Sequence, residues 1–371
     1  GRGDINIAVK PETPDELFLG ILFEDIAAVY QNDEMAHFTG EGVELNTKGT
    51  PKLLPLDQLG KGTGYVSLNI RNAKVPDLSV YQRYIPTEKA ITLHGGQGTL
   101  EGDLEMTPKS LNAEISLASN NADISFEDYR FNTDLAVGVK TNVPSFASGR
   151  VDISGTYLRM DDSRLANKKM DHQSQSWHTA LTIDKGVLDL PMPAAEKGKD
   201  DIKSLSKALK GRDLKDLVKK SDGEFRINGS VSDLAWINLL FTNAYNLSVG
   251  GSGNISADMR IAAGLPASGS VLKASSRELE IDILDYVATG NGQVSLKISG
   301  GGEQPDMDLN MKIEDASLMR SEEMESFINE VEMKLHAQAK NLHFDGSDKL
   351  SELHFQIPSA KVTDMAIYDQ Y

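Results

Sequence analysis

Alternation of apolar and polar residues between Asp77 and Val139 constrains the fold more than any other feature of the chain. In the last part, residues 131–139, Phe, Thr, Leu and Val occupy the odd positions, and polar or small residues occupy the even ones. A period of two over this length is typical of a strand with one covered face. We therefore expect strands over 113–119, 122–126 and 131–139, with hairpin turns between them at Gly, Pro and Asn-Asn. A short amphipathic turn or helix over 77–86 precedes these strands.

The same unit is predicted to recur further along the chain. Residues 233–241 are again short and amphipathic, and a second Gly-Gly-x-Gly passage follows them. The residues that match in one register are Gly95, Gly96, Gly98, Leu100, Asp103 and Leu104 with Gly250, Gly251, Gly253, Ile255, Asp258 and Met259. This match predicts an internal repeat, which bears on any fold assignment.

Other alternating segments extend the β prediction along the chain. They lie at 64–71, 151–160, 177–184, 187–190, 224–231, 253–261, 269–274, 278–283, 287–290, 292–299 and 306–313. We expect a loop over the polar residues 161–176 and a helix over Met319 to Lys334, with Ser321 as its N-cap. The run 16–23 fits either a helix or a buried strand. The predicted fold is mainly β: an extended, twisted antiparallel sheet, as a curved gutter or an open sandwich, with a few amphipathic covering helices.

Composition and pattern divide the chain into five segments. These are an N-terminal irregular and β segment (1–63), a first β-meander unit (64–193), a basic amphipathic helix linker (194–222), a second β-meander unit (223–318), and a C-terminal helix with strands (319–371). The linker carries Lys203, Lys207, Lys210 and Lys215, which are candidates for docking to a membrane or a partner. The alternative is a crossover helix that covers an open end of the sheet and keeps its lysines in solvent.

Charge and cysteine content exclude several classes of function. The formal net charge is −17, which argues against nucleic-acid binding because that requires a basic surface. The absence of cysteine excludes disulfides, thiol catalysis and cysteine-based zinc sites. Apolar runs are shorter than the roughly 18 residues that a membrane helix needs. Since there is no initiator Met or signal peptide, we expect a segment of a longer protein.

The search for catalytic motifs gives no enzyme signature. The Gly60 to Gly64 passage is not a phosphate loop, because a strand follows it where a helix is needed. His336, His343 and His354 lie in successive terminal strands and could converge on a metal, or they could be ordinary surface histidines. We expect a protein that is not an enzyme and that has no cofactor and no metal.

Several passages resemble the AsmA-like superfamily of Gram-negative envelope proteins, which includes the TamB-like and YdbH-like families. They are the turn at 75–86, the strand at 98–104, the strand at 150–158, and the passage from Asp233 to Gly253 with 269–272. The resemblance implies a periplasmic protein that an N-terminal segment absent from this sequence anchors in the inner membrane. It also implies a twisted sheet with an apolar groove, related to bridge-like lipid transfer proteins, and a role in phospholipid transport between the two membranes or in envelope integrity. The implied partners are phospholipid acyl chains and envelope membranes or envelope proteins.

The strand pattern itself allows such a groove but does not require it. An apolar strand face would solvate an acyl chain at roughly 0.8 kcal/mol per buried methylene. The candidate lining residues are Leu68, Ile70, Ile115, Leu117, Ile124, Phe126, Leu135, Val137, Ile281, Ile283, Val294, Leu296 and Ile298. The same alternation also fits two sheets that bury these residues in a dry core, and without the resemblance this sandwich would be favoured. A second function class is a structural or adhesive β-repeat protein of a cell surface or phage particle that does not bind lipid.

Overall fold

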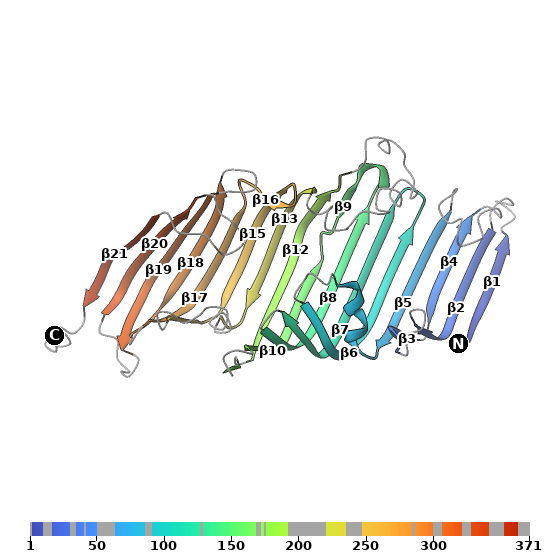
Figure 1. The fold of residues 1–371 in the computed structure, drawn as a ribbon, viewed down its shortest axis with the longest axis horizontal. Coiled ribbons are helices and arrows are strands. Elements are labelled where there is room, and N and C mark those ends of the chain that lie inside the picture. Colours follow the sequence, from blue (N-terminus) through green and yellow to red (C-terminus); the bar gives the residue numbers. More distant parts are fainter. Residues whose placement is uncertain are drawn as a thin grey trace. The chain divides into compact units, whose positions relative to one another are not determined.

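The structure is a computed structural model, and it is mainly β. It describes residues 2–9, 17–29, 35–40, 42–49, 64–85, 91–126, 129–167, 172–173, 176–191, 220–234, 247–283, 286–299, 306–320, 328–340 and 352–362. These residues form long antiparallel strands and only two short 3-10 helices (Figure 1). The predicted mainly β, antiparallel architecture is confirmed. No helix within the described ranges is long and apolar enough to cross a membrane.

The chain divides into two compact units. Unit 1 comprises Gly1–Asp161 and Ile183–Gly223, and unit 2 comprises Asp162–Thr182 and Glu224–Tyr371. The strands β10 (Tyr157–Asn167) and β12 (Trp177–Asp189) contribute residues to both units, and β11 (His172–Gln173) pairs with β10. Each unit is described separately below.

Unit 1 is a meander in which most strands pair with their neighbours in the chain. Its strands are β1 (Arg2–Val9), β2 (Leu17–Ala28), β3 (Phe38–Gly40), β4 (Val43–Gly49), β5 (Tyr65–Val75), β6 (Ile91–Met106), β7 (Leu111–Phe126), β8 (Tyr129–Val143) and β9 (Arg150–Asp152). Antiparallel pairing joins β1, β2, β4, β5, β6, β7 and β8 in that order. The short β3 pairs with both β2 and β5. The run after residue 16, which fitted a helix or a strand, is therefore a strand.

Unit 2 repeats this meander with strands of similar length. Its strands are β13 (Asp222–Val231), β14 (Leu247–Gly250), β15 (Gly253–Ala262), β16 (Leu265–Pro266), β17 (Val271–Ile283), β18 (Tyr286–Ser299), β19 (Asp306–Arg320), β20 (Ile328–Ala339) and β21 (Glu352–Val362). Both β14 and β15 pair with β17, so they act as one long strand that is interrupted at Gly251. From β17 to β21 each strand pairs with the next.

Bulges interrupt many of these strands where the sequence suggested turns. Asn120 and Asn121 do not form a hairpin turn; they lie inside β7, and the register with β8 shifts between Ser119 and Ala122. Asn121 has a φ of 55°, a left-handed conformation that Asn tolerates better than most residues. A bulge of this kind bends a strand without ending it. The expected separate strands 113–119 and 122–126 are therefore one strand.

Several of the buried side chains lie beside these bulges. In unit 1, Ala73 and Ala122 are fully buried, and Ser119 and Thr133 are almost fully buried. In unit 2, a core cluster of Leu279, Ile313, Ala316 and Val331 occupies the corresponding place. The unit 1 residues named here are small, which fits a bent strand because bending brings its side chains and those of its neighbours close together.

The 3-10 helix η3 (Leu78–Tyr84) lies across the apolar side of unit 1 (Figure 1). Asp77 caps it, since its carboxylate accepts a hydrogen bond of 2.8 Å from the Ser79 amide. Leu78 is 2% exposed and packs against Val75 and Ala122. The Gln82 side-chain amide connects η3 to β6. Its Nε2 atom donates to the Ile91 backbone carbonyl at 3.1 Å, and its Oε1 atom accepts from the Leu93 backbone N–H at 2.7 Å. A second 3-10 helix, η4 (Phe146–Ser148), connects β8 to β9.

The two Gly-Gly-x-Gly passages share their local geometry. Gly96 and Gly251 both have positive φ, at 128° and 93°. In each unit a leucine approaches this passage: a Cβ on Gly96 would lie 3.2 Å from Leu78, and a Cβ on Gly253 would lie 3.5 Å from Leu234. These features agree with the repeat that the sequence predicts. The expected second amphipathic turn over 235–241 lies outside the described residues.

Three further expectations are wrong in detail. Residues 328–334 of the expected helix 319–334 belong to strand β20, while 321–327 are not described. Part of the expected loop 161–176 belongs to β10, in which Ser163 and Leu165 are fully buried. The expected strand 151–160 is divided by a turn at Gly155, where φ is 86°. In the first two cases a bulge residue with positive φ, Glu330 or Asp162, disturbs the alternation on which the prediction depended.

Candidate binding surfaces

The first candidate surface is the apolar face of unit 1. Pairing in β6, β7 and β8 places Leu100, Leu117 and Val137 side by side. A neighbouring row contains Ile70, Gly102, Ile115 and Val139. Because successive side chains of a strand point to opposite faces, both rows lie on one face of the sheet. All the unit 1 residues that the sequence placed on a groove belong to this face by register.

The apolar face of unit 2 is built in the same way. Val294 lies between Ala274 and Met311, and Leu296 lies between Leu272 and Leu309. Ile298 is opposite Met307, and Ile281 is opposite Ala288. Backbone register places Ile283 opposite Tyr286 on the same face. The unit 2 residues that the sequence placed on a groove therefore share one face of the sheet by register.

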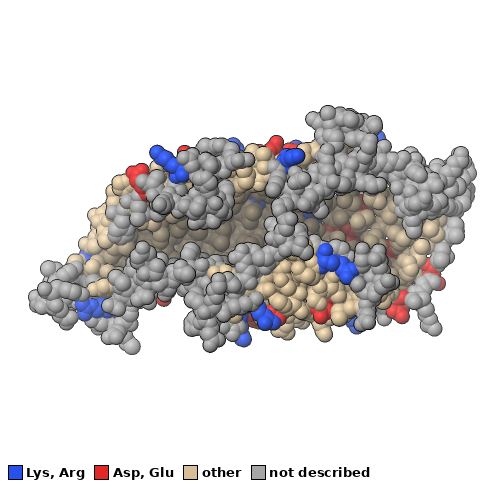
Figure 2. Space-filling view, in the orientation of Figure 1, with Lys and Arg blue, Asp and Glu red and all other residues tan. Residues whose placement is uncertain are grey.

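Side chains on these two faces are only partly covered. Ile115 is 44% exposed and its neighbour Val139 is 42% exposed. The other candidate lining residues whose side chains are described are half-buried, and none belongs to the core: Leu68, Ile70, Leu117, Ile124, Leu135, Val137, Ile281, Val294, Leu296 and Ile298. The side chains of Phe126 and Ile283, and the whole of Lys203, Lys207, Lys210 and Lys215, lie outside the described part. In Figure 2 few charged side chains interrupt the described surface on view.

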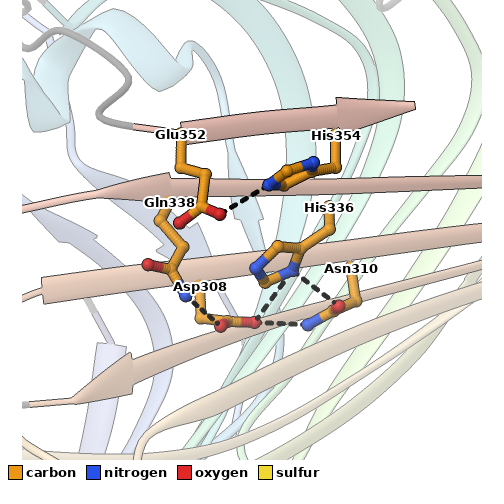
Figure 3. A network of polar contacts seen from close by, with 6 residues as sticks. All are labelled: Asp308, Asn310, His336, Gln338, Glu352 and His354. Atoms are coloured by element: carbon orange, nitrogen blue, oxygen red, sulfur yellow. Dashed lines mark hydrogen bonds and ion pairs between the residues drawn. The ribbon is translucent and has the colours of Figure 1, made fainter.

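The second candidate surface is a network of polar side chains on β19, β20 and β21 (Figure 3). His336 and His354 are direct cross-strand partners, and their rings are stacked with centroids 6.4 Å apart. The His336 Nδ1 atom lies 2.9 Å from the Asn310 Oδ1 atom and 3.9 Å from an Asp308 carboxylate oxygen. The His354 Nε2 atom lies 2.5 Å from the Glu352 Oε1 atom. Two of the three histidines singled out in the sequence thus meet, and His343 is not described.

Lysines and glutamates continue this network along the same face. Lys334 lies 2.8 Å from Glu332, and Lys312 lies 3.4 Å from Glu332 and contacts Glu314. The hydrogen bond from Lys334 lowers the pKa of the Glu332 carboxyl below its ordinary value. The hydrogen bond to Glu314 raises the pKa of the Lys312 ammonium. Both pKa shifts favour the charged forms of Glu332 and Lys312.

A groove of about 990 Å³ crosses unit 2 between two rows of polar side chains. The first polar row is Ser256, Lys273, Ser295, Asn310, His336 and His354. The second polar row is Asn254, Ser275, Gln293, Lys312, Lys334 and Gln356. The residues between the rows, such as Val294 and Met311, also line the groove. We call this feature the polar groove.

The polar groove lies on the face opposite to the apolar side chains. A smaller pocket of about 420 Å³ shares Asn254, Ser275 and Gln293 with it and also includes Gly292. On the apolar face Gly292 is covered, since a Cβ there would lie 2.3 Å from the Leu279 side chain. Both hollows therefore lie on the polar face. The apolar residues between the two rows border the groove through their backbone, because their side chains point the other way.

A histidine and a serine also meet on the polar side of unit 1. The His94 Nε2 atom lies 2.8 Å from the Ser125 Oγ atom. The Ser125 side chain is only 4% exposed, however, and neither of the two hollows described above includes it. A serine nucleophile needs room for its substrate and donors for the developing oxyanion. We therefore assign the His94–Ser125 contact to the stability of the β6–β7 pair.

Asp123, on the same side, forms a two-pronged ion pair with Arg130. The Arg130 Nε atom donates to the carboxylate at 2.7 Å, and its second nitrogen binds the other carboxylate oxygen. This hydrogen bonding lowers the pKa of Asp123 below its ordinary value. The folded state therefore holds the charged carboxylate more tightly than the unfolded chain does.

Replacing Asp123 by asparagine should make unfolding less sensitive to acid. A lowered folded-state pKa gives stability that is present above the unfolded-state pKa and is lost as the pH falls through the folded-state pKa. The wild-type urea midpoint should therefore fall more steeply than that of Asp123→Asn between about pH 5 and pH 2. Glu101→Gln is the control, because Glu101 has no ion pair or hydrogen bond among the described side chains. Equal slopes for the wild type and Asp123→Asn would show that the ion pair does not contribute.

Metal binding gains no support from the side-chain geometry. Among the described residues, no three side chains of His, Cys, Asp or Glu are placed to hold a metal ion. Comparison with known proteins adds no assignment: no protein-family model matches the chain. No curated protein and no solved structure matches it either.

The sequence missed the polar groove, and the reason is physical. Its described lining comes from seven strands, β13, β15 and β17 to β21, and each strand contributes only two or three positions. In a single strand such as β18, Gln293 and Ser295 look like the ordinary solvent-facing residues of an alternating pattern. Only the strand register shows that these positions form continuous rows. An available signal was the scarcity of carboxylates at these positions in an acidic chain.

Proposed function

We propose that this chain is a non-enzymatic β-scaffold whose apolar strand faces hold phospholipid acyl chains in a bacterial envelope. On this proposal it is a periplasmic, AsmA-like protein that contributes to phospholipid transport between the inner and outer membranes or to envelope integrity. The acyl chains would contact the apolar faces of unit 1 and unit 2. The anchor to the inner membrane would be a segment outside this sequence.

The observation that carries the proposal is the partial exposure of the apolar faces. Two sheets packed face to face bury their inner side chains almost completely in a core about 10 Å thick. Here the described candidate residues of the apolar rows are half-buried or exposed, whereas full burial occurs at other positions, such as Leu78 of η3, Phe146 of η4 and Leu165 of β10. Continuous exposed apolar surface of this kind marks a site of binding to lipid or protein. Acyl chains fit it without any specific polar contact, because their transfer from water depends only on buried area.

Native mass spectrometry of the chain, purified from the periplasm and membranes of a Gram-negative host, tests this function. The proposal expects bound phospholipid that survives gentle purification and is released by organic extraction. A lipid-free chain, even after incubation with phospholipid vesicles, would contradict it. The structural or adhesive β-repeat function would then account better for the same strands.

A further inference from the structure

The polar groove of unit 2 differs in charge from the chain that contains it. The chain has 55 Asp and Glu residues against 38 Lys and Arg residues. None of the described residues that line the groove is Asp or Glu, whereas three are lysine and two are histidine. Carboxylates occur on the same face of the same strands: Asp308, Glu332 and Glu352 lie just outside the lining and contact its cationic side chains, which leaves Lys273 as the lining lysine without an ion pair among the described residues. A hollow whose described lining carries lysine and no carboxylate, and in which Lys273 has no ion pair, favours an anionic ligand.

One part of the groove presents polar groups that are not used within the protein. On β15, β17 and β18 the polar lining side chains are Asn254, Ser256, Lys273, Ser275, Gln293 and Ser295. None of them makes a hydrogen bond or ion pair to another side chain or backbone group in the described part of the chain. Taken together, their hydroxyl, amide and ammonium groups offer about as many hydrogen-bond donors as acceptors. A ligand rich in hydroxyl groups matches this set.

The dimensions of the groove indicate a linear ligand. The six strands β15, β17, β18, β19, β20 and β21 are consecutive neighbours, so at about 4.8 Å per strand the rows extend for about 24 Å. The same two row positions repeat on each strand, which gives a periodic series of contacts. No Phe, Tyr or Trp is among the described residues that line the groove, so this part of the lining offers a neutral glycan no aromatic ring on which to stack. Binding by the described lining therefore rests on charge and hydrogen bonds.

We propose that the polar groove binds a linear acidic polysaccharide, with its carboxylate or other anionic groups at Lys273, Lys312 and Lys334 and its hydroxyls at the amide and serine side chains. Lys273 is the main cationic contact, because Lys312 and Lys334 already pair with Glu332. This site is on the face opposite to the apolar rows, and it does not depend on lipid binding there.

Calorimetric titration of the purified chain with polygalacturonate, and with dextran as a neutral comparison, tests the site. We expect saturable binding of polygalacturonate that Lys273→Glu weakens by about tenfold or more, since it replaces an attractive charge by a repulsive one. Gln293→Ala should weaken binding by about threefold through a lost hydrogen bond. Lys297→Glu is the matched control for Lys273→Glu. It makes the same charge change on the neighbouring strand β18, on the face that carries the groove but outside the groove's lining.

Three outcomes would overturn the proposal. The first is an absence of saturable binding by the wild type. The second is an equal loss of affinity in Lys297→Glu and Lys273→Glu, which would mean that overall charge and not the groove decides binding. The third is binding to phosphatidylglycerol vesicles that depends on Lys273 when polygalacturonate does not bind, which would make this face a membrane contact. Circular dichroism of each variant confirms that it is folded.

Discussion

Replacing Gly251 by alanine should destabilise unit 2 by about 2 to 5 kcal/mol. Two costs add: a left-handed backbone costs a residue with a Cβ about 1–2 kcal/mol, and forcing extra atoms into a packed site costs about 1–3 kcal/mol. Gly251 has a φ of 93°, and a Cβ there would lie 1.9 Å from the backbone oxygen of Glu278. The atoms nearest to that Cβ belong to the backbone of Glu278 and Leu279, so no flexible side chain could move aside to make room. The strand formed by β14 and β15 would have to separate from β17.

Gly42 offers a matched control for this substitution. Its φ is 74°, but a Cβ there would meet no atom within 4 Å. Gly42→Ala should therefore cost only the backbone term of about 1–2 kcal/mol. Urea unfolding followed by circular dichroism gives both values, and hydrogen exchange shows whether the loss is confined to the pairing of β14 and β15 with β17. Equal costs at the two positions would show that the close approach at Gly251 is not real.

Placing a carboxylate at Ile115 should remove most of any lipid that the chain carries. Ile115 is 44% exposed, so Ile115→Asp need not disturb the core, and the two units should remain folded. A charge on the apolar face opposes the acyl chains directly, because burying an unpaired carboxylate costs several kcal/mol. We expect the phospholipid recovered per mole of protein to fall by about tenfold, the change that about 1.4 kcal/mol produces.

The adjacent residue supplies the control for Ile115→Asp. Ser116 belongs to the same strand, but its side chain points to the opposite face. Ser116→Asp adds the same charge and should leave the lipid content unchanged. A similar loss of lipid in both variants would attribute the effect to net charge, and unchanged lipid in Ile115→Asp would exclude this face as the binding surface.

Strand faces were predictable from the sequence, whereas strand lengths were not. The alternation of Phe131, Thr133, Leu135 and Val137 placed these residues on one face, and the register of β7 and β8 confirms it. The ends of the strands were not predictable where a bulge occurs, because the extra residue of a bulge breaks the period of two in the same way as a turn does. The sequence therefore predicts a turn at Asn121, where the structure has a bulge.

The expected helix over 319–334 shows how a bulge can imitate helical spacing. Ile328, Val331 and Met333 pack against one core cluster, so they share a face of β20. The spacing of three between the first two arises because Glu330 is a bulge residue with a φ of 52°. Apolar residues three apart are also the mark of one face of a helix. Only the pairing of β20 with β19 distinguishes the two, and pairing is a tertiary property.

The two candidate surfaces differ in the same way in how far the sequence alone could predict them. The apolar faces follow from local alternation, which the sequence displays strand by strand. The polar groove and the His336–His354 pair depend on which residues of neighbouring strands stand opposite each other. A shift of one residue in register would move every one of these side chains to the other face. Single-strand patterns do not contain that information.

Site-specific photo-crosslinking to lipid tests the central claim most directly. A photoreactive amino acid would be placed at Ile115 and Leu296 on the apolar faces, and at Ser116 and Lys297 on the opposite face. Irradiation in a living Gram-negative host, followed by mass spectrometry, would identify the attached molecules. The account predicts phospholipid adducts at the first two positions and none at their neighbours. Adducts that are absent from all four positions, or equal at both faces, would contradict it.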